Sequence, residues 1–178
     1  MTMQIDSIIR ILPPPSMPNE IPNNGWAVVE DHIGTALPAD YKAFIERYGS
    51  GRIDGFLWVF NPFSQKKNIN LLDQIEVRVG GLKYLLEEFS QPCPYPLFPQ
   101  PGGLFPFAGT DNGNTIYWIT RGNPDEWWVV VNEARGPRFE EFRSNAIAFL
   151  HGILTKRSVC DVLPREFPRD VHDFNPIL

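Results

Sequence analysis

Proline sets the strongest limit on where regular structure can form in this chain. Of its 178 residues 18 are proline, and 11 of these lie in residues 13–22 and 92–106. Proline breaks helix interiors, and in sheets it is confined to edges, strand starts and bulges. We therefore expect a polyproline-like linker at 13–22, neither a helix nor a central strand at 91–103, and a short edge-like strand at 104–108.

Apolar periodicity predicts four helices and four further strands outside those segments. The clearest stripe is Tyr41, Phe44, Ile45 and Tyr48, in a helix that begins near Pro38 and ends at Gly49. The other helices are expected at 24–33, 70–89 and 145–155, the last capped by Ser144, and the other strands at 53–60, 115–120, 127–132 and 138–142. This order predicts an α+β fold, in which a twisted, mainly antiparallel sheet packs with N-terminal helices, one long central helix and a closing C-terminal helix.

The chain length favours a single domain with short extensions at both ends. Residues 1–12 have a short helix-like spacing that stops at Pro13, so we expect 1–22 to form an N-terminal arm and linker. Residues 155–178 contain three prolines and no apolar period, and we expect an extended tail on the surface.

The charge balance argues against two classes of partner. Sixteen Lys and Arg against 21 Asp and Glu give a net charge of −5, which disfavours nucleic acid and anionic membranes and suits a basic protein partner. The apolar runs at 56–60 and 127–131 are far shorter than the roughly 20 residues of a membrane span. With no secretion signal and two widely spaced cysteines, Cys93 and Cys160, a cytoplasmic location is expected.

Motifs for catalysis, metal binding or cofactor binding are not evident. The sequence lacks phosphate-binding loops, nucleophile elbows and zinc motifs, and its three histidines are far apart. Asp111 and Asn112 begin a stretch that resembles half a calcium loop, but turn chemistry explains it better. We therefore expect no catalytic residue, no metal and no cofactor.

Two adjacent tryptophans stand out in the strand expected at 127–132. One ring should face inward and the other outward, because neighbouring strand residues point to opposite faces. An exposed Trp128 beside Asp125 and Glu126 is a plausible interface anchor. Alternatively, a helix or the proline-rich segment covers the second face of the sheet as well.

One stretch resembles a known family signature. In the SUKH superfamily a helix with an acidic residue leads through Leu-Pro-x-Asp-Tyr into an aromatic-lined helix and a glycine-rich turn. Softer similarity follows at Phe107, Ala108 and Asp111, and the resemblance covers about 24–154. The matching positions of the main motif are Trp26, Glu30, Gly34, Leu37, Pro38, Asp40, Tyr41, Phe44, Tyr48, Gly49 and Gly51.

The resemblance implies an α+β fold and, in bacteria, an immunity protein that binds and neutralises a cognate polymorphic or contact-dependent toxin, often a nuclease. Fungal relatives are regulators of the cell wall and of signalling, so a non-catalytic regulatory or scaffold module is the alternative. The motif residues themselves look structural, because their spacing places them in a core and in turns.

The hypothesis from sequence is a non-catalytic protein that binds a toxin through a surface. Its candidate toxin-binding residues are Asp54, Asp111, Asn112, Asp125, Glu126 and Trp128. A third class, an undetected enzyme, would use Asp111, His151 or the acidic pairs, and would require them to converge in one pocket.

Overall fold

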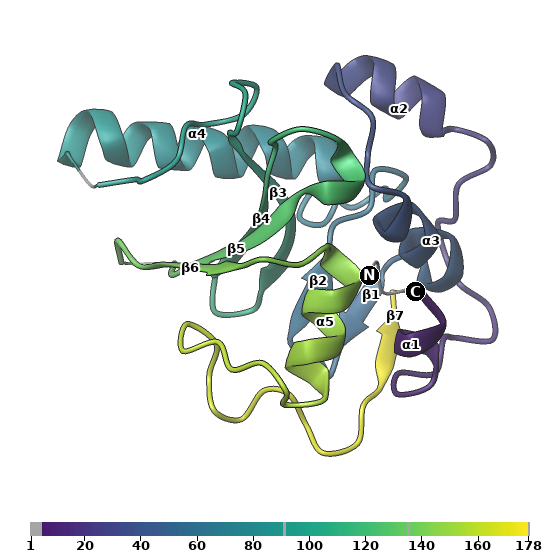
Figure 1. The fold of residues 1–178 in the computed structure, drawn as a ribbon. Helices are drawn as coiled ribbons and strands as arrows, with labels where there is room; N and C mark the ends of the chain where they lie inside the picture. The colour runs from purple at the N-terminus through teal and green to yellow at the C-terminus, as the bar shows by residue number, and fades with distance from the viewer. Residues whose placement is uncertain (1–4, 91, 135, 178) are drawn as a thin grey trace.

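The computed structural model describes residues 5–90, 92–134 and 136–177 (Figure 1). Residues 1–4 of the expected arm, residue 91 of the proline-rich segment and residue 178 of the expected tail lie outside this description. The helices are α1 (Ile5–Ile9), α2 (Trp26–Ile33), α3 (Ala39–Tyr48), α4 (Leu71–Phe89) and α5 (Ala146–Leu154), with a short 3-10 helix at Pro124–Glu126. The strands are β1 (Gly51–Ile53), β2 (Leu57–Val59), β3 (Leu104–Thr110), β4 (Thr115–Ile119), β5 (Trp128–Asn132), β6 (Phe139–Phe142) and β7 (Phe174–Pro176).

All the strands join one antiparallel sheet, in the order β6-β5-β4-β3-β2-β1-β7. The sheet lies between α4 on one side and α1, α3 and α5 on the other (Figure 1). The α+β fold expected from the sequence is therefore confirmed. The helices at 24–33, 70–89 and 145–155 are each found within two residues of their expected ends.

Both faces of the central strands are buried. On one face Trp118 and Val129 join the large core formed with α3 and α5. On the other face Tyr117 and Val130 pack with Leu82 of α4 and with side chains of the proline-rich segment. Strands buried on both faces need no polar alternation, which explains the continuous apolar runs in β3 and β4.

The strand expected at the sheet edge is in fact central. β3 pairs with β2 on one side and with β4 on the other, and all of its residues are buried. The sheet accommodates Pro106 because the β3–β4 register shifts between Pro106 and Ala108. Phe107 is the residue without a partner in β4, and Pro106 lies directly beside this bulge, a place where sheets tolerate proline.

The single strand expected at 53–60 is a hairpin of β1 and β2. Asp54 and Gly55 both have positive φ, and the backbone N–H of Phe56 donates to the carbonyl of Ile53 at 3.0 Å. Positive φ at both central positions is the type I′ geometry that suits a tight hairpin. The aromatic run around Asp54-Gly55 hid this turn signal.

Residues 5–22 of the N-terminal arm contribute to the core and do not form a free linker. Ile8 and Leu12 are fully buried, and the hydroxyl of Tyr48 donates to the carbonyl of Leu12 at 2.6 Å. Further along, Asn19 lies against Gly49, where a Cβ would come within 2.0 Å of the Asn19 carbonyl. Gly49 is thus required by its positive φ and by this close approach.

The expectation of a surface tail at 155–178 is also corrected for its described residues, 155–177. Cys160, Leu163, Phe167 and Phe174 are buried, and β7 adds to the sheet beside β1. The sequence of this segment has no apolar period because its buried residues lie outside helices and long strands. They pack against residues that are distant in the chain.

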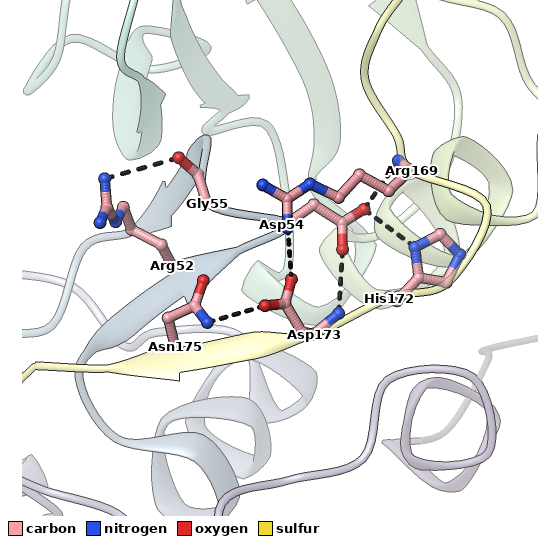
Figure 2. Close-up of polar contacts among 7 residues, drawn as sticks. All are labelled: Arg52, Asp54, Gly55, Arg169, His172, Asp173 and Asn175. Carbon is pink, nitrogen blue, oxygen red and sulfur yellow. Dashed lines mark hydrogen bonds and ion pairs between the residues drawn. The ribbon is translucent and has the colours of Figure 1, made fainter.

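A buried carboxylate attaches this C-terminal segment (Figure 2). Asp54, at the β1–β2 turn, is 3% exposed. Its oxygens accept hydrogen bonds from the backbone N–H groups of Arg169 at 3.1 Å and Asp173 at 3.0 Å. The ring Nδ1 of His172 lies 2.9 Å from Asp54 Oδ2. Asp54 therefore satisfies backbone donors that would otherwise be buried unpaired.

Residues of the 26–51 motif pack in the core and form turns. Trp26 packs edge-on against Tyr41, and Tyr41 packs edge-on against Trp118 in the sheet. Phe44 and Tyr48 stack on each other. Leu37 is buried, Pro38 precedes α3, Gly34 ends α2 with positive φ, and Gly51 lies in close contact with Phe174.

Two acidic residues of the motif hold helix termini. Glu30 Oε1 accepts from the backbone N–H of Leu37 and from Lys42 Nζ, both at 2.8 Å. Asp40 accepts from the N–H of Tyr41 at 2.8 Å and from that of Ile147 at 2.9 Å, so it joins α3 to the start of α5. The cap of α5 is Asn145, whose Oδ1 accepts from the N–H of Ala148, and the expectation of a Ser144 cap is wrong.

We predict that Asp54→Asn lowers the free energy of unfolding by about 2 kcal/mol, because the amide NH2 would face a buried backbone donor. Amide hydrogen exchange at 169–177 should rise more than exchange in α3. Urea unfolding and hydrogen exchange measure the two effects. Asp170→Asn is the control, since Asp170 is 93% exposed in its ion pair with Lys156 and should change stability little. Equal stability losses in the two variants would contradict the assigned role of Asp54.

Glu30→Gln should show a pH-dependent cost. Burial acts to raise the pKa of Glu30, but the Leu37 N–H and Lys42 outweigh it and hold this pKa below its ordinary value of 4.5. A carboxylate whose pKa is lower in the native state than in the unfolded chain stabilises the fold at pH values above its unfolded-state pKa. This stabilisation is lost as the pH falls through the native-state pKa. The variant should be less stable by about 1 kcal/mol at pH 7, and the difference should shrink below about pH 4. Urea unfolding across this range tests it, and a difference independent of pH would contradict it.

Candidate functional site

The candidate residues lie at opposite ends of the central strands. Trp128 pairs with Ile119, which pairs with Leu104 at the start of β3. Asp111 and Asn112 follow the other end of β3. Because a strand rises about 3.3 Å per residue, the two groups are about 20 Å apart along the sheet. The structure does not bring them together into one site.

At the Asp111 end of the strands, two side chains contact the Asp111 carboxylate. Trp58 Nε1 donates to Asp111 Oδ1 at 2.6 Å, and Arg52 Nη1 lies 3.4 Å from Oδ2. The Arg52 guanidinium stacks over the Trp58 ring, 4.9 Å from its centroid. Asn112 accepts a hydrogen bond from the Thr110 hydroxyl. This end presents an ordered, half-exposed acidic turn.

At the Trp128 end of the strands, the neighbouring carboxylates of Asp125 and Glu126 have different surroundings. Asp125 Oδ1 accepts from the backbone N–H of Ala39 at 2.7 Å and so holds the start of α3. Glu126 is exposed, and within the described residues its carboxylate makes no hydrogen bond or ion pair. Glu126 is therefore available to a partner, whereas part of Asp125 is committed to the fold.

The two tryptophans at this end face opposite ways, as expected. Trp127 is 3% exposed and packs in the core with Phe105 and Trp118, whereas Trp128 is 38% exposed. The second face of the sheet is covered by α4 and the proline-rich segment, but this cover leaves much of Trp128 open. Both sequence interpretations thus hold in part.

Two hollows meet at Trp128 and Glu126. The first has a volume of about 350 Å³ and is lined by Tyr95, Ile119, Arg121, Glu126, Trp128 and Glu141. The second has a volume of about 290 Å³ and is lined by Asp125, Glu126, Trp128, Arg143, Ser144, Asn145 and Ala148. Together they give this end a recessed surface around an aromatic ring.

The walls of these hollows are fixed by polar contacts. The Tyr95 hydroxyl donates to Glu141 Oε2 at 3.2 Å, and Arg143 Nε lies 3.4 Å from Glu141 Oε1. The Arg143 guanidinium stands 5.0 Å from the centroid of the Trp128 ring. Burial, with the charge of Glu141, raises the pKa of the Tyr95 hydroxyl, so it remains a donor at neutral pH.

The sequence-based candidate Asp54 lies in neither group. Its carboxylate is enclosed by the C-terminal segment (Figure 2), so it has no surface to offer a partner. We therefore leave Asp54 out of the proposed binding surface.

Sequence reasoning missed the basic and aromatic partners of the candidates. These are Arg52 and Trp58 at the Asp111 end, and Tyr95, Arg121 and Arg143 at the Trp128 end. The tryptophan in β2 could have been found from strand alternation. Tyr95 lies in a proline-rich segment without periodicity, so no local signal places it beside β6.

The groups that an enzyme would use are dispersed. Asp111 lies at the β3–β4 turn, His151 is on α5, and Glu87 pairs with Lys83 on α4. Among residues 5–90, 92–134 and 136–177, no group of three or more His, Cys, Asp or Glu side chains is placed to hold a metal ion. In the same ranges, no helix has both the length and the apolar character needed to cross a membrane.

Comparison with known families gives one match. Residues 23–150 match the family model SUKH_6, described as SMI1-KNR4 cell-wall. Searches among curated proteins and among solved structures found no match. The matched range runs from just before α2 into α5, so it contains the motif helices and six of the strands, β1 to β6. Because the match covers most of the sequence, the chain belongs to the SUKH superfamily, in its SUKH_6 (SMI1-KNR4 cell-wall) family.

Proposed function

We propose that this protein is a stoichiometric protein binder of the immunity type, which neutralises a cognate bacterial toxin by covering its working surface. Membership of the SUKH superfamily supports an immunity or SMI1/KNR4-type role in general. Inhibition by coverage needs no chemistry, since an interface of about 800 Å² per partner can close an active site.

The observation that carries the proposal is the exposed ring of Trp128 on a strand that is otherwise buried. Residues 129–132 of β5 are buried, so the ring stands on a rigid base, and it lines two hollows. Interface energy concentrates in aromatic and arginine side chains that fill or form such recesses. A preformed anchor also costs little ordering entropy on binding.

Charge supports a basic partner surface at this end. Glu126 has no partner in the described residues, and the carboxylates of Asp125 and Glu141 are close by in the linings of the two hollows. If the toxin is a nuclease, such carboxylates can take the place of substrate phosphates and accelerate encounter. We include Asp111 and Asn112 as a second, separate contact region.

The alternative function is a non-catalytic regulatory or scaffold module. The family description, SMI1-KNR4 cell-wall, favours it. Its partner would be a cell-wall or signalling protein, and the same Trp128 surface would serve it. The genes beside this one separate the two functions, because an immunity protein is expected next to its toxin.

Co-expression with the toxin encoded next to the gene tests the main proposal. We expect this protein to restore growth and to co-purify with the toxin in a fixed ratio. Unchanged toxicity with no complex in a pull-down would contradict it. Rescue without a complex would equally contradict inhibition by binding.

Trp128→Ala should weaken the complex at least about 30-fold, the loss expected for an interface hot spot, with little change in the unfolding midpoint. Calorimetry on the purified pair measures the affinity. Tyr84→Ala is the matched control, because Tyr84 is another exposed aromatic side chain, on α4. An equal loss for both variants, or none for Trp128→Ala, would move the interface away from this end of the sheet.

A further inference from the structure

Trp128 contacts a cation and also lines a hollow. The guanidinium of Arg143, which is itself 76% exposed, stacks at 5.0 Å from the ring centroid. The ring also lines the 350 Å³ hollow, together with Tyr95, Glu126 and Glu141. We infer that this hollow binds a basic side chain, arginine or lysine, presented by a protein partner. This inference rests on the proposed function and specifies the chemistry of its anchor.

Arg143 shows which chemistry the ring and its neighbours select. Its guanidinium contacts both the face of Trp128 and a carboxylate oxygen of Glu141. A cation over an indole ring is attracted by the negative face of the ring, and tryptophan is the strongest aromatic partner. The hollow offers a partner the same two elements, the aromatic side chain and acidic oxygens.

One carboxylate of the hollow is left for a cation. The lining carries the carboxylates of Glu126 and Glu141 and the guanidinium of Arg121, and Arg143 forms an ion pair with Glu141. Glu126 has no hydrogen bond or ion pair in the described residues, so its charge is not compensated locally. The Glu141 carboxylate is oriented by the Tyr95 hydroxyl. Arg121 is exposed and forms no ion pair in the described residues, so its long side chain can turn toward solvent.

The size of the hollow suits one side chain. A volume of about 350 Å³ is at the lower end of the range for small-molecule sites. It is large enough for the planar head of an arginine, and Tyr95, Trp128 and Glu126 are among the residues that would surround it. The remainder of the partner would lie over Arg143 and the second hollow.

The test uses the protein alone with capped arginine (acetyl-arginine-amide) as the probe. Titration followed by NMR should move the indole Nε1–H signal of Trp128 and the amide signals of Ile119 and Glu126. Capped citrulline, which has nearly the same shape but no charge, should leave these signals in place. Equal shifts with both probes, or none with arginine, would overturn the inference.

Charge variants identify the carboxylates that act. Glu126→Gln and Glu141→Gln should each weaken the binding of capped arginine by about threefold, as expected for exposed ion pairs and cation–π contacts. Glu166→Gln is the control, since Glu166 is exposed, has no partner among the described residues, and lies outside this hollow. An equal loss of affinity in all three variants would show that only the net charge of the protein matters, and would overturn the assignment of this hollow as the binding site.

Failure here is distinguishable from failure of the proposed function. Capped arginine requires no toxin, so a negative titration removes the basic anchor while growth rescue still tests the immunity role. Conversely, a positive titration without growth rescue would leave the basic-side-chain site in place on a protein with another kind of partner.

Discussion

Burial of both faces of β3 and β4 is the constraint on which the rest of the structure depends. It requires α3 and α5 on one face and α4 with the proline-rich segment on the other. The cover ends at the start of β5, where Trp127 points into the core and Trp128 points out. The candidate surface therefore exists because the second layer stops short of the sheet end, and its rigidity comes from the buried strand beneath it.

The sequence predicted the elements whose signal is local. The Tyr41-to-Tyr48 stripe and the long 70–89 pattern gave helices with nearly correct ends, because apolar spacing there reflects a single buried face. It did not predict the packing of 5–22 or 155–177, because the contacts of Leu12, Asn19 and Phe174 are formed with residues distant in the chain. The Asp54-Gly55 turn was detectable as a hairpin signal, but it was hidden within an apolar run.

In the candidate site, too, local features were predictable from the sequence and contacts between distant segments were not. Strand alternation sufficed to separate Trp127 from Trp128, whereas no sequence rule distinguishes a free carboxylate from one that holds a backbone. Asp54 secures the C-terminal segment and Asp125 holds the start of α3, while Glu126 has no partner among the described residues. Tyr95 and Arg143 reach Trp128 from segments whose positions only tertiary structure defines. The family match adds the class of function but not the surface that performs it.

Amide hydrogen exchange of this protein, free and in complex with the neighbouring-gene toxin, shows whether a protein partner binds over Trp128. We expect protection on binding to be strongest at 119–128 and 141–143, with little change in β7. Protection confined to the β1–β7 edge, or to the turn that follows β3, would contradict it.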